Sequence, residues 1–418
     1  GDGSQTVTGV IVVTHAYRRA FAVILAVLLG IFAGCSGSNE VPTPAAEQPS
    51  DTNSQAGSTQ GSASSATGEP SPGGSGENSA PSATTPAKLG NVTAVRLADF
   101  RSGWVGGKGW IARTDDAGKS WRVQHQVEGA VEQVFALNHQ LAWATVARDG
   151  AADGERLLYH TKDGGKHWSL VGKVPQPGFL HFVSGQEGFV AHWRTTDGGK
   201  TWKPLPVPKQ LTGDAYFHDK ANGWAVTQEN GVFQVMRTVD GGQSWSAVMK
   251  RETVAPLSGA VIRSAGKDDA WIQCIGGYGM NQTSYSLFHT TDGGRHWQTV
   301  IAKSTAGGGP APGFPANYPG GPTIDGSAPG PLYVVNPDIA FMGGRCMACD
   351  LPNTIGWTKD GGKTLEKGTE SFPGYGDMLL AFEDGNKGWL ICSDSKEPTV
   401  MYTTVDGGKH WEKMHVFN

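Results

Sequence analysis

A short pattern of small, aromatic and apolar residues recurs along the chain from residue 103 onward. Each copy runs from Gly or Ala to Trp or Phe and then to an apolar residue, as in Gly103-Trp104-Val105. Apolar runs this short, bounded by polar turn residues, are typical of buried β-strands. The copies are residues 103–105, 142–144, 188–190, 223–225, 270–272, 340–342 and 388–390. We therefore expect seven repeats, each with one buried strand of this kind.

A second pattern, Thr-x-Asp-x-Gly-x-x-Trp, follows each of these strands. Thr and Asp have short side chains that hydrogen-bond the backbone amides of a tight turn. Gly adopts the positive φ that such turns need, and Trp packs a large ring beside the turn. The aspartates are Asp116, Asp163, Asp197, Asp240, Asp292, Asp360 and Asp406, and the copy at Asp360 has Leu365 in place of Trp. We predict that these aspartates stabilise turns and that none is catalytic.

The two patterns together predict the fold. Each repeat reads as an inner strand, the aromatic strand, a hairpin, a third strand, the turn and an outer strand. Successive turn aspartates are between 34 residues (Asp163 to Asp197) and 68 residues (Asp292 to Asp360) apart, which brackets the spacing of propeller repeats. The widest gap holds a Gly- and Pro-rich insertion at residues 304–331. The expected fold class is all-β: a seven-bladed β-propeller of four-stranded blades over residues 90–418.

The turn motif resembles the Asp-box, or bacterial neuraminidase repeat. Asp-boxes occur in sialidases, some glucanases, sortilin-type receptors and photosystem II stability/assembly factors. The repeat motif here is G-W-A/V followed by T-x-D-G-G-K-x-W. It is most similar to the repeats of the last group, and the resemblance covers about 330 residues, essentially the whole folded domain. The resemblance implies a non-catalytic scaffold that binds or chaperones other proteins, without a cofactor. Relatives of this group include envelope lipoproteins.

A glycosidase is the alternative function. The resemblance to sialidases would imply three arginines, a Tyr-Glu pair and an aspartic acid, with the first arginine in an Arg-Ile-Pro motif. That motif is absent from residues 95–101. The three arginines that could come together in such a site are Arg194, Arg237 and Arg263. A retaining glycosidase needs two carboxyl groups about 5 Å apart, and no local pattern names such a pair. A carbohydrate-binding propeller without catalysis is a third hypothesis.

The N-terminal segment predicts export. Arg18 and Arg19 precede an apolar run at residues 20–31, which ends in Phe32-Ala33-Gly34-Cys35. Residues 1–35 therefore resemble a signal peptide with a lipobox, in which Cys35 is the site of lipid attachment. An uncleaved anchor is the alternative, although the run is short for a membrane span.

Residues 36–89 are rich in Ser, Gly and Pro, so we expect a disordered linker. The signal peptide and the linker together predict an extracytoplasmic protein that is lipid-anchored to the bacterial membrane through Cys35.

Charge narrows the list of partners. The net charge is −4 and the isoelectric point is about 6.3, so the chain lacks the basic footprint of a nucleic-acid-binding protein. We expect another envelope protein as the partner, with carbohydrate as the alternative ligand, and no cofactor.

Four further cysteines, Cys274, Cys346, Cys349 and Cys392, carry candidate chemistry. Outside the cytoplasm an even number of cysteines favours disulfides, and four cysteines allow three pairings. We expect disulfides that bridge neighbouring blades. A four-cysteine zinc site and a redox-active Cys-x-x-Cys pair are the alternatives, and no metal is predicted.

Overall fold

The computed structural model describes residues 89–150 and 154–418. The predicted signal peptide, Cys35 and all of the predicted linker except Leu89 lie outside the described residues. The described residues form 26 β-strands. Among them, no helix has the length and apolar character needed to cross a membrane. Because neighbouring strands pair in chain order, each sheet is an antiparallel meander.

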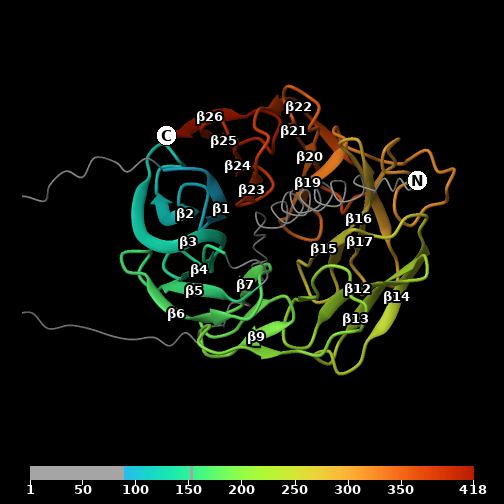
Figure 1. Cartoon of the computed structure of the whole chain (residues 1–418), viewed down its shortest axis with the longest axis horizontal. Helices are drawn as coiled ribbons and strands as arrows, with labels where there is room; N and C mark the ends of the chain where they lie inside the picture. Colours follow the sequence, from blue (N-terminus) through green and yellow to red (C-terminus); the bar gives the residue numbers. More distant parts are fainter. Residues whose placement is uncertain (1–88, 151–153) are drawn as a thin grey trace, which may run out of the picture. The chain divides into compact units, whose positions relative to one another are not determined.

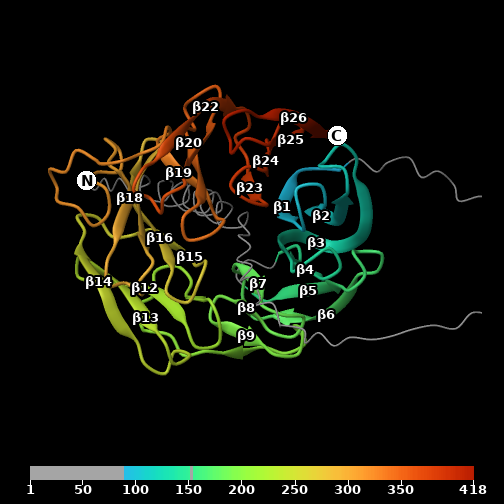
Figure 2. The same ribbon diagram turned by 180° about the vertical axis from the view of Figure 1, so that it is seen from behind.

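The strands form six sheets arranged around a ring (Figures 1 and 2). The first sheet contains β1 (Val92–Leu97), β2 (Gly103–Thr114), β3 (Arg122–Ala136), β4 (Ala142–Ala147), β5 (Arg156–Thr161) and β6 (Ser169–Val174). The second contains β7 (Leu180–Phe182), β8 (Gly188–Val190), β9 (Trp193–Thr195) and β10 (Lys203–Pro204). The third contains β11 (Tyr216–Phe217), β12 (Gly223–Glu229), β13 (Val232–Thr238) and β14 (Ser246–Glu252).

The remaining sheets follow the same order. The fourth contains β15 (Gly259–Arg263), β16 (Ala270–Gly279), β17 (Gln282–Thr290) and β18 (Gln298–Lys303). The fifth contains β19 (Ala328–Val334), β20 (Ala340–Arg345), β21 (Asn353–Thr358) and β22 (Glu366–Phe372). The sixth contains β23 (Met378–Phe382), β24 (Gly388–Cys392), β25 (Thr399–Thr404) and β26 (Glu412–Phe417). Strands β1, β7, β15, β19 and β23, each the first of its sheet, lie toward the middle of the ring (Figure 1).

The predicted number of seven four-stranded blades is wrong. The structure has six sheets, and the first has six strands. The cause is β3, whose N-terminal half pairs with β2 and whose C-terminal half pairs with β4. The segment between the two halves stays extended, and Ala130 pairs with both Lys108 and Ala147. The first two repeats are therefore joined into one sheet, whereas every later repeat has a sheet of its own.

The recurring aromatics form the cores of the sheets. The seven side chains are all less than 2% exposed: Trp104, Trp143, Phe189, Trp224, Trp271, Phe341 and Trp389. Burying an aromatic side chain of this size contributes about 2–3 kcal/mol to the free energy of unfolding. The predicted pattern of one buried aromatic strand in each repeat is confirmed.

Each of the seven aspartates lies in a turn with one shared set of hydrogen bonds. At Asp240, Oδ1 accepts from the Thr238 hydroxyl (2.8 Å) and the Ser244 amide (2.9 Å), and Oδ2 accepts from the Ser244 hydroxyl (2.5 Å). The Gly242 amide donates to Thr238 Oγ1 at 2.8 Å. The corresponding bonds occur at Asp116, Asp163, Asp197, Asp292, Asp360 and Asp406. These contacts account for the Thr-x-Asp-x-Gly pattern.

The meander gives the ring two different ends. Turns between first and second strands and the Asp-box turns lie at one end, called here the Asp-box end. Hairpins between second and third strands and the connections between sheets lie at the other, the hairpin end.

The ring closes by contacts between the first and sixth sheets. Trp389 Nε1 donates to the Phe100 carbonyl at 2.9 Å, and the Ser393 hydroxyl donates to the Val92 carbonyl at 3.0 Å. The Trp121 ring packs edge-on against Trp389. Since β1 pairs with β2 and β26 pairs with β25, the first and last strands lie in different sheets. We call this contact the seam.

Candidate functional site

A cleft with a volume of about 640 Å³ lies along the inner strands of the first four sheets. This volume is in the range of about 300–1,000 Å³ typical of ligand sites. Strands β3, β7, β11 and β15 contribute to its walls, as do the connections that lead into β7 and β11 at the hairpin end. The residues that line it include Gln176, Phe179, His181, Asp214, Tyr216 and Arg263.

Three of these side chains occupy one repeated position. It is the inner-strand residue paired with the buried aromatic of the second strand, for example His181 opposite Phe189. Directly opposite residues of an antiparallel pair lie on the same face of a sheet. The seven inner-ring positions are Arg96, Phe135, His181, Tyr216, Arg263, Tyr333 and Ala381. All are buried.

The aromatic rings in and near the cleft each pack against another side chain. The Arg263 guanidinium carbon lies 3.8 Å from the centre of the Phe179 ring. His181 and Tyr216 stack with ring centres 5.1 Å apart and an angle of 12° between the planes. Cation–π and stacking contacts of this kind hold the side chains in place. The second, third and fourth sheets therefore provide the cleft with rigid walls.

His181 lies in positive surroundings. Its Nε2–H donates to the Phe217 carbonyl at 2.8 Å. Burial and the nearby charges of His218, Arg263 and Arg96 together lower the pKa of His181 to about 3, against the effect of the hydrogen bond. The imidazole is thus neutral at neutral pH.

Two carboxyl groups border the cleft in different environments. Burial raises the pKa of Asp214, although Arg263 and a hydrogen bond from Gln176 (3.4 Å) act in the opposite direction. Glu132 accepts a hydrogen bond from Arg156 Nε at 2.7 Å. Asp214 is therefore easier to protonate than an ordinary aspartate.

The three arginines considered for a sialidase site do not form one cluster. Arg194 and Arg237 each directly precede an Asp-box Thr, on β9 and β13. Arg194 bonds Glu187 at 2.5 Å and Arg237 bonds Asp268 at 2.8 Å. Arg263 lies on the inner strand β15. Two of the three are thus used in contacts at the Asp-box end, and only Arg263 lines the cleft.

The cysteines differ from the expected arrangement. Cys346 and Cys349 form a disulfide, and Cys274 and Cys392 are buried free thiols. Burial raises the pKa of each free thiol to about 12. The predicted bridges between neighbouring blades are therefore not formed, because Cys346 bonds within its own hairpin. A four-cysteine zinc site is incompatible with this pairing, and residues 89–150 and 154–418 contain no cluster of three or more His, Cys, Asp or Glu suited to a metal.

His181 and Asp214 were not identified from the sequence. The signal for His181 was present, since each inner-ring position precedes its aromatic by eight residues, as His181 precedes Phe189. Nothing local marks Asp214, because its pKa depends on desolvation beside the cleft and on Arg263 from another strand.

Comparisons with known proteins agree with the repeat assignment. The BNR/Asp-box repeat family matches residues 193–204. The curated protein "Photosystem II assembly lipoprotein Ycf48" from Synechococcus sp. (strain CC9902) is 31% identical over 116 residues. The match covers 25% of this chain and 33% of the relative, so it spans about a third of the relative's length.

Solved structures with a similar arrangement were also found. "YCF48 bound to D1 peptide" has a TM-score of 0.46 and 14% identity, and covers 77% of this chain and 92% of that one. "YCF48 from Cyanidioschyzon merolae" has a TM-score of 0.45 and 16% identity, and covers 79% of this chain and 97% of that one. A GH74 xyloglucanase from Xanthomonas campestris has a TM-score of 0.34 and 16% identity. The match covers 78% of this chain and 58% of the xyloglucanase. The chain is a β-propeller that contains a match to the BNR/Asp-box repeat at residues 193–204, and its sequence is similar in part to that of Ycf48.

Proposed function

We propose that this chain is a non-catalytic scaffold that binds a segment of another protein in the cleft along its inner strands. The observation that carries the proposal is the construction of the cleft. Its volume of about 640 Å³ suits a short segment of polypeptide, and its walls are held rigid by stacked side chains. A preformed site of this kind loses little conformational entropy when a ligand binds.

The charges favour an acidic segment. The charges of Arg96 and Arg263 both lower the pKa of His181, so the inner strands carry a positive electrostatic potential there. Arg263 is held over the Phe179 ring at 3.8 Å, which presents its guanidinium in a fixed orientation. Guanidinium groups bind carboxylates through paired hydrogen bonds. A segment carrying Asp or Glu is therefore the expected ligand.

The similarity to a lipoprotein involved in photosystem II assembly supports an assembly role. By extension, we propose that this chain helps to assemble a membrane protein complex at the cell envelope. Lipid attachment at Cys35 would keep the propeller close to such a complex.

Carbohydrate binding is less well supported. Sugar-binding sites usually present an open aromatic face to the ligand. Here Arg263 covers Phe179, and His181 stacks on Tyr216, so neither ring is free on the side of its partner.

Glycoside hydrolysis is the second candidate because two carboxyl groups border the same cleft. Asp214 has a raised pKa, and Glu132 accepts a hydrogen bond from Arg156. A hydrolysis screen with sialosides and glucans, comparing the full chain with Asp214→Asn, tests this reading. Turnover that disappears in Asp214→Asn would establish the enzyme and contradict the scaffold.

The scaffold is tested first by site-specific photocrosslinking in living cells. A photoreactive amino acid replaces Gln176, which lines the cleft, or Gln243, which is exposed at the Asp-box end. We expect the probe at residue 176 to capture the same one or two envelope proteins reproducibly and the probe at 243 to capture neither. Equal capture from both positions, or none from residue 176, would contradict binding in the cleft.

Binding of the captured segment is then measured on the full chain by calorimetry. We expect Arg263→Gln to weaken the affinity about tenfold or more, in line with loss of a charged hydrogen bond. Arg237→Gln is the matched control, because the Arg237 side chain is only 10% exposed and also stacks on a ring, that of Trp224, but lies at the Asp-box end. Equal weakening by both variants would indicate a general loss of structure instead.

A further inference from the structure

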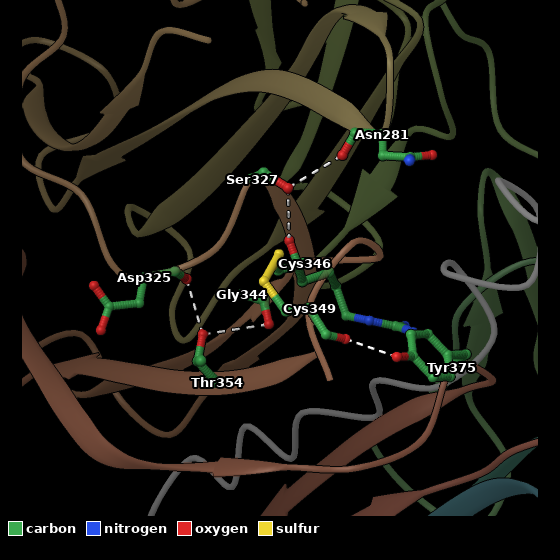
Figure 3. Close-up of a disulfide and its surroundings, with 9 residues drawn as sticks. Asn281, Asp325, Ser327, Gly344, Cys346, Cys349, Thr354 and Tyr375 are labelled. Atoms are coloured by element: carbon green, nitrogen blue, oxygen red, sulfur yellow. Dashed lines mark hydrogen bonds between the residues drawn. A yellow bond between two sulfur atoms is a disulfide. The ribbon is translucent and has the colours of Figure 1, made fainter. Parts of the chain in front are cut away.

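The disulfide lies in the hairpin loop of residues 346–352, between β20 and β21 (Figure 3). The ends of this loop are already joined by backbone contacts. Arg345 and Asn353 form the last pair of the strand ladder, and the Cys346 amide donates to the Pro352 carbonyl at 2.8 Å. The disulfide encloses only two further residues. A bridge across so short a loop restricts the unfolded chain least, so a structural role alone does not account for it.

The two sulfurs differ in their surroundings. Cys349 is exposed and Cys346 is half-buried. Arg345 precedes Cys346, and its Nη2 lies 3.6 Å from Met347 Sδ, so a guanidinium lies within the loop region. Because Cys349 is the more exposed of the two sulfurs, an incoming thiolate would attack it, with Cys346 as the leaving group.

The loop is connected to its neighbours at the hairpin end. The Tyr375 hydroxyl, from the connection between β22 and β23, donates to the Cys349 carbonyl at 2.7 Å (Figure 3). Arg345 Nη2 also donates to the Gly376 carbonyl at 2.7 Å. The position of Cys349 thus determines whether one contact between two successive sheets can form.

We propose that Cys346–Cys349 is a thiol–disulfide exchange site that accepts two electrons from a dithiol protein. One partner thiolate bonds to Cys349 Sγ, the bond between Cys349 and Cys346 breaks, and its electron pair passes to Cys346. The second partner thiolate attacks the partner sulfur of this mixed disulfide and releases Cys349, so the partner ends as a disulfide. Cys346 and Cys349 end as two thiols after taking up protons. Reduction releases residues 346–352 from Tyr375.

The chain carries an internal control. Cys274 and Cys392 are fully buried, with pKa values raised to about 12, and buried thiols of this kind are inert. They report whether the domain is still folded when the exposed pair reacts.

The test equilibrates the full chain at pH 7 with defined ratios of reduced and oxidised dithiothreitol, alkylates it, and maps the labels by mass spectrometry. We expect Cys346 and Cys349 to be labelled together, in a single two-electron transition, while Cys274 and Cys392 stay unlabelled. Labelling of the pair only when the buried thiols also react would overturn the proposal, because reduction would then require unfolding.

Hydrogen exchange tests the release of the loop. In the reduced protein we expect amides of residues 346–352 and 373–377 to exchange about tenfold faster, with the other sheets unchanged. Unchanged exchange in both segments would overturn the release. Tyr375→Phe should accelerate the same amides in the oxidised protein, and Tyr278→Phe, an exposed tyrosine on another hairpin, should not.

The double variant Cys346→Ser, Cys349→Ser separates exchange from folding. We expect its amides to exchange as fast as those of the reduced protein, with rates that do not change when dithiothreitol is added. Its melting temperature should be close to that of the oxidised chain. A large fall in melting temperature would identify the bridge as a structural staple and overturn the proposal.

Discussion

At the scale of single residues, the most repeated feature is a carboxylate that completes a turn. Asp240 accepts three hydrogen bonds from Thr238 and Ser244, and these bonds lower its pKa. The same residue type thus serves two purposes in this chain. In the turns it is held by hydrogen bonds that lower its pKa, whereas beside the cleft the pKa of Asp214 is raised, because desolvation there outweighs the effects of Arg263 and Gln176. Only the second environment suits ligand binding.

Replacing Asp240 with Ala should lower the melting temperature by a few degrees, because the turn amides and hydroxyls lose their acceptor. Thermal unfolding of the full chain measures this. Gln243→Ala, at an exposed position of the same turn, is the control and should change little. An unchanged melting temperature in Asp240→Ala would count against the role in the turn.

His181 should make stability depend on pH. Its pKa is about 3 in the fold and about 6.5 in an unfolded chain, so the unfolded chain binds the proton more readily between these values. Its contribution is therefore present above pH 6.5 and is lost as the pH falls toward 3. Between pH 7.5 and 5 the loss should be about 2 kcal/mol.

Urea unfolding at these two pH values, compared between the native chain and His181→Gln, isolates this effect. Glutamine can still donate to the Phe217 carbonyl but does not titrate. The variant should lose less stability on acidification by about 2 kcal/mol. Identical pH dependence in the two proteins would show that His181 is already protonated or exposed.

At the scale of elements, β3 is the unusual strand. Its middle crosses from one repeat to the next while remaining paired, and Gly129 lies at the crossing with φ of 141°. A Cβ at Gly129 would lie 2.0 Å from the Ala147 carbonyl oxygen. The close approach of the two backbones therefore requires glycine.

Gly129→Ala should reduce the free energy of unfolding by about 2 kcal/mol or more, since both the clash and the positive φ oppose a side chain. Gly154→Ala is the control, because a Cβ there meets no atom within 4 Å. Urea denaturation of both variants gives the comparison. Equal stabilities would mean that β3 can bend away from Ala147 without cost.

The sequence predicts the buried aromatics and the turns well because both depend on residues close together in the chain. Trp224 and Asp240 each belong to a local pattern that recurs. The number of sheets could not be predicted from local patterns, because it depends on Ala130 pairing with both Lys108 and Ala147. The cleft is harder still, because His181 and Arg263 meet through the packing of sheets that are far apart in sequence.

At the scale of the whole molecule, the ring depends on the seam. No strand is shared between the first and sixth sheets, so closure relies on contacts such as those of Trp389, Ser393 and Val92. Propellers avoid exposed edges through closure. The seam is therefore where we expect the ring to open first when it is destabilised.

Trp389→Phe should cost about 1 kcal/mol more than Trp224→Phe. Both indoles are fully buried and each packs edge-on against an Asp-box Trp. Trp389 Nε1 bonds Phe100 across the seam, whereas Trp224 Nε1 has no hydrogen-bond partner. Chemical denaturation of the two variants gives the difference. Equal losses would mean that the seam bond adds nothing to stability.

The shared strand β3 also bears on how such a chain can change by copying or losing repeats. Each of the last five sheets begins and ends at the hairpin end. A duplication can therefore add one such sheet, or a deletion remove one, with all its strands whole. The same event in the first sheet would cut β3 and leave half of it without a neighbour. Genes for related propellers should therefore vary by whole units after residue 174 and inherit residues 92–174 as one piece.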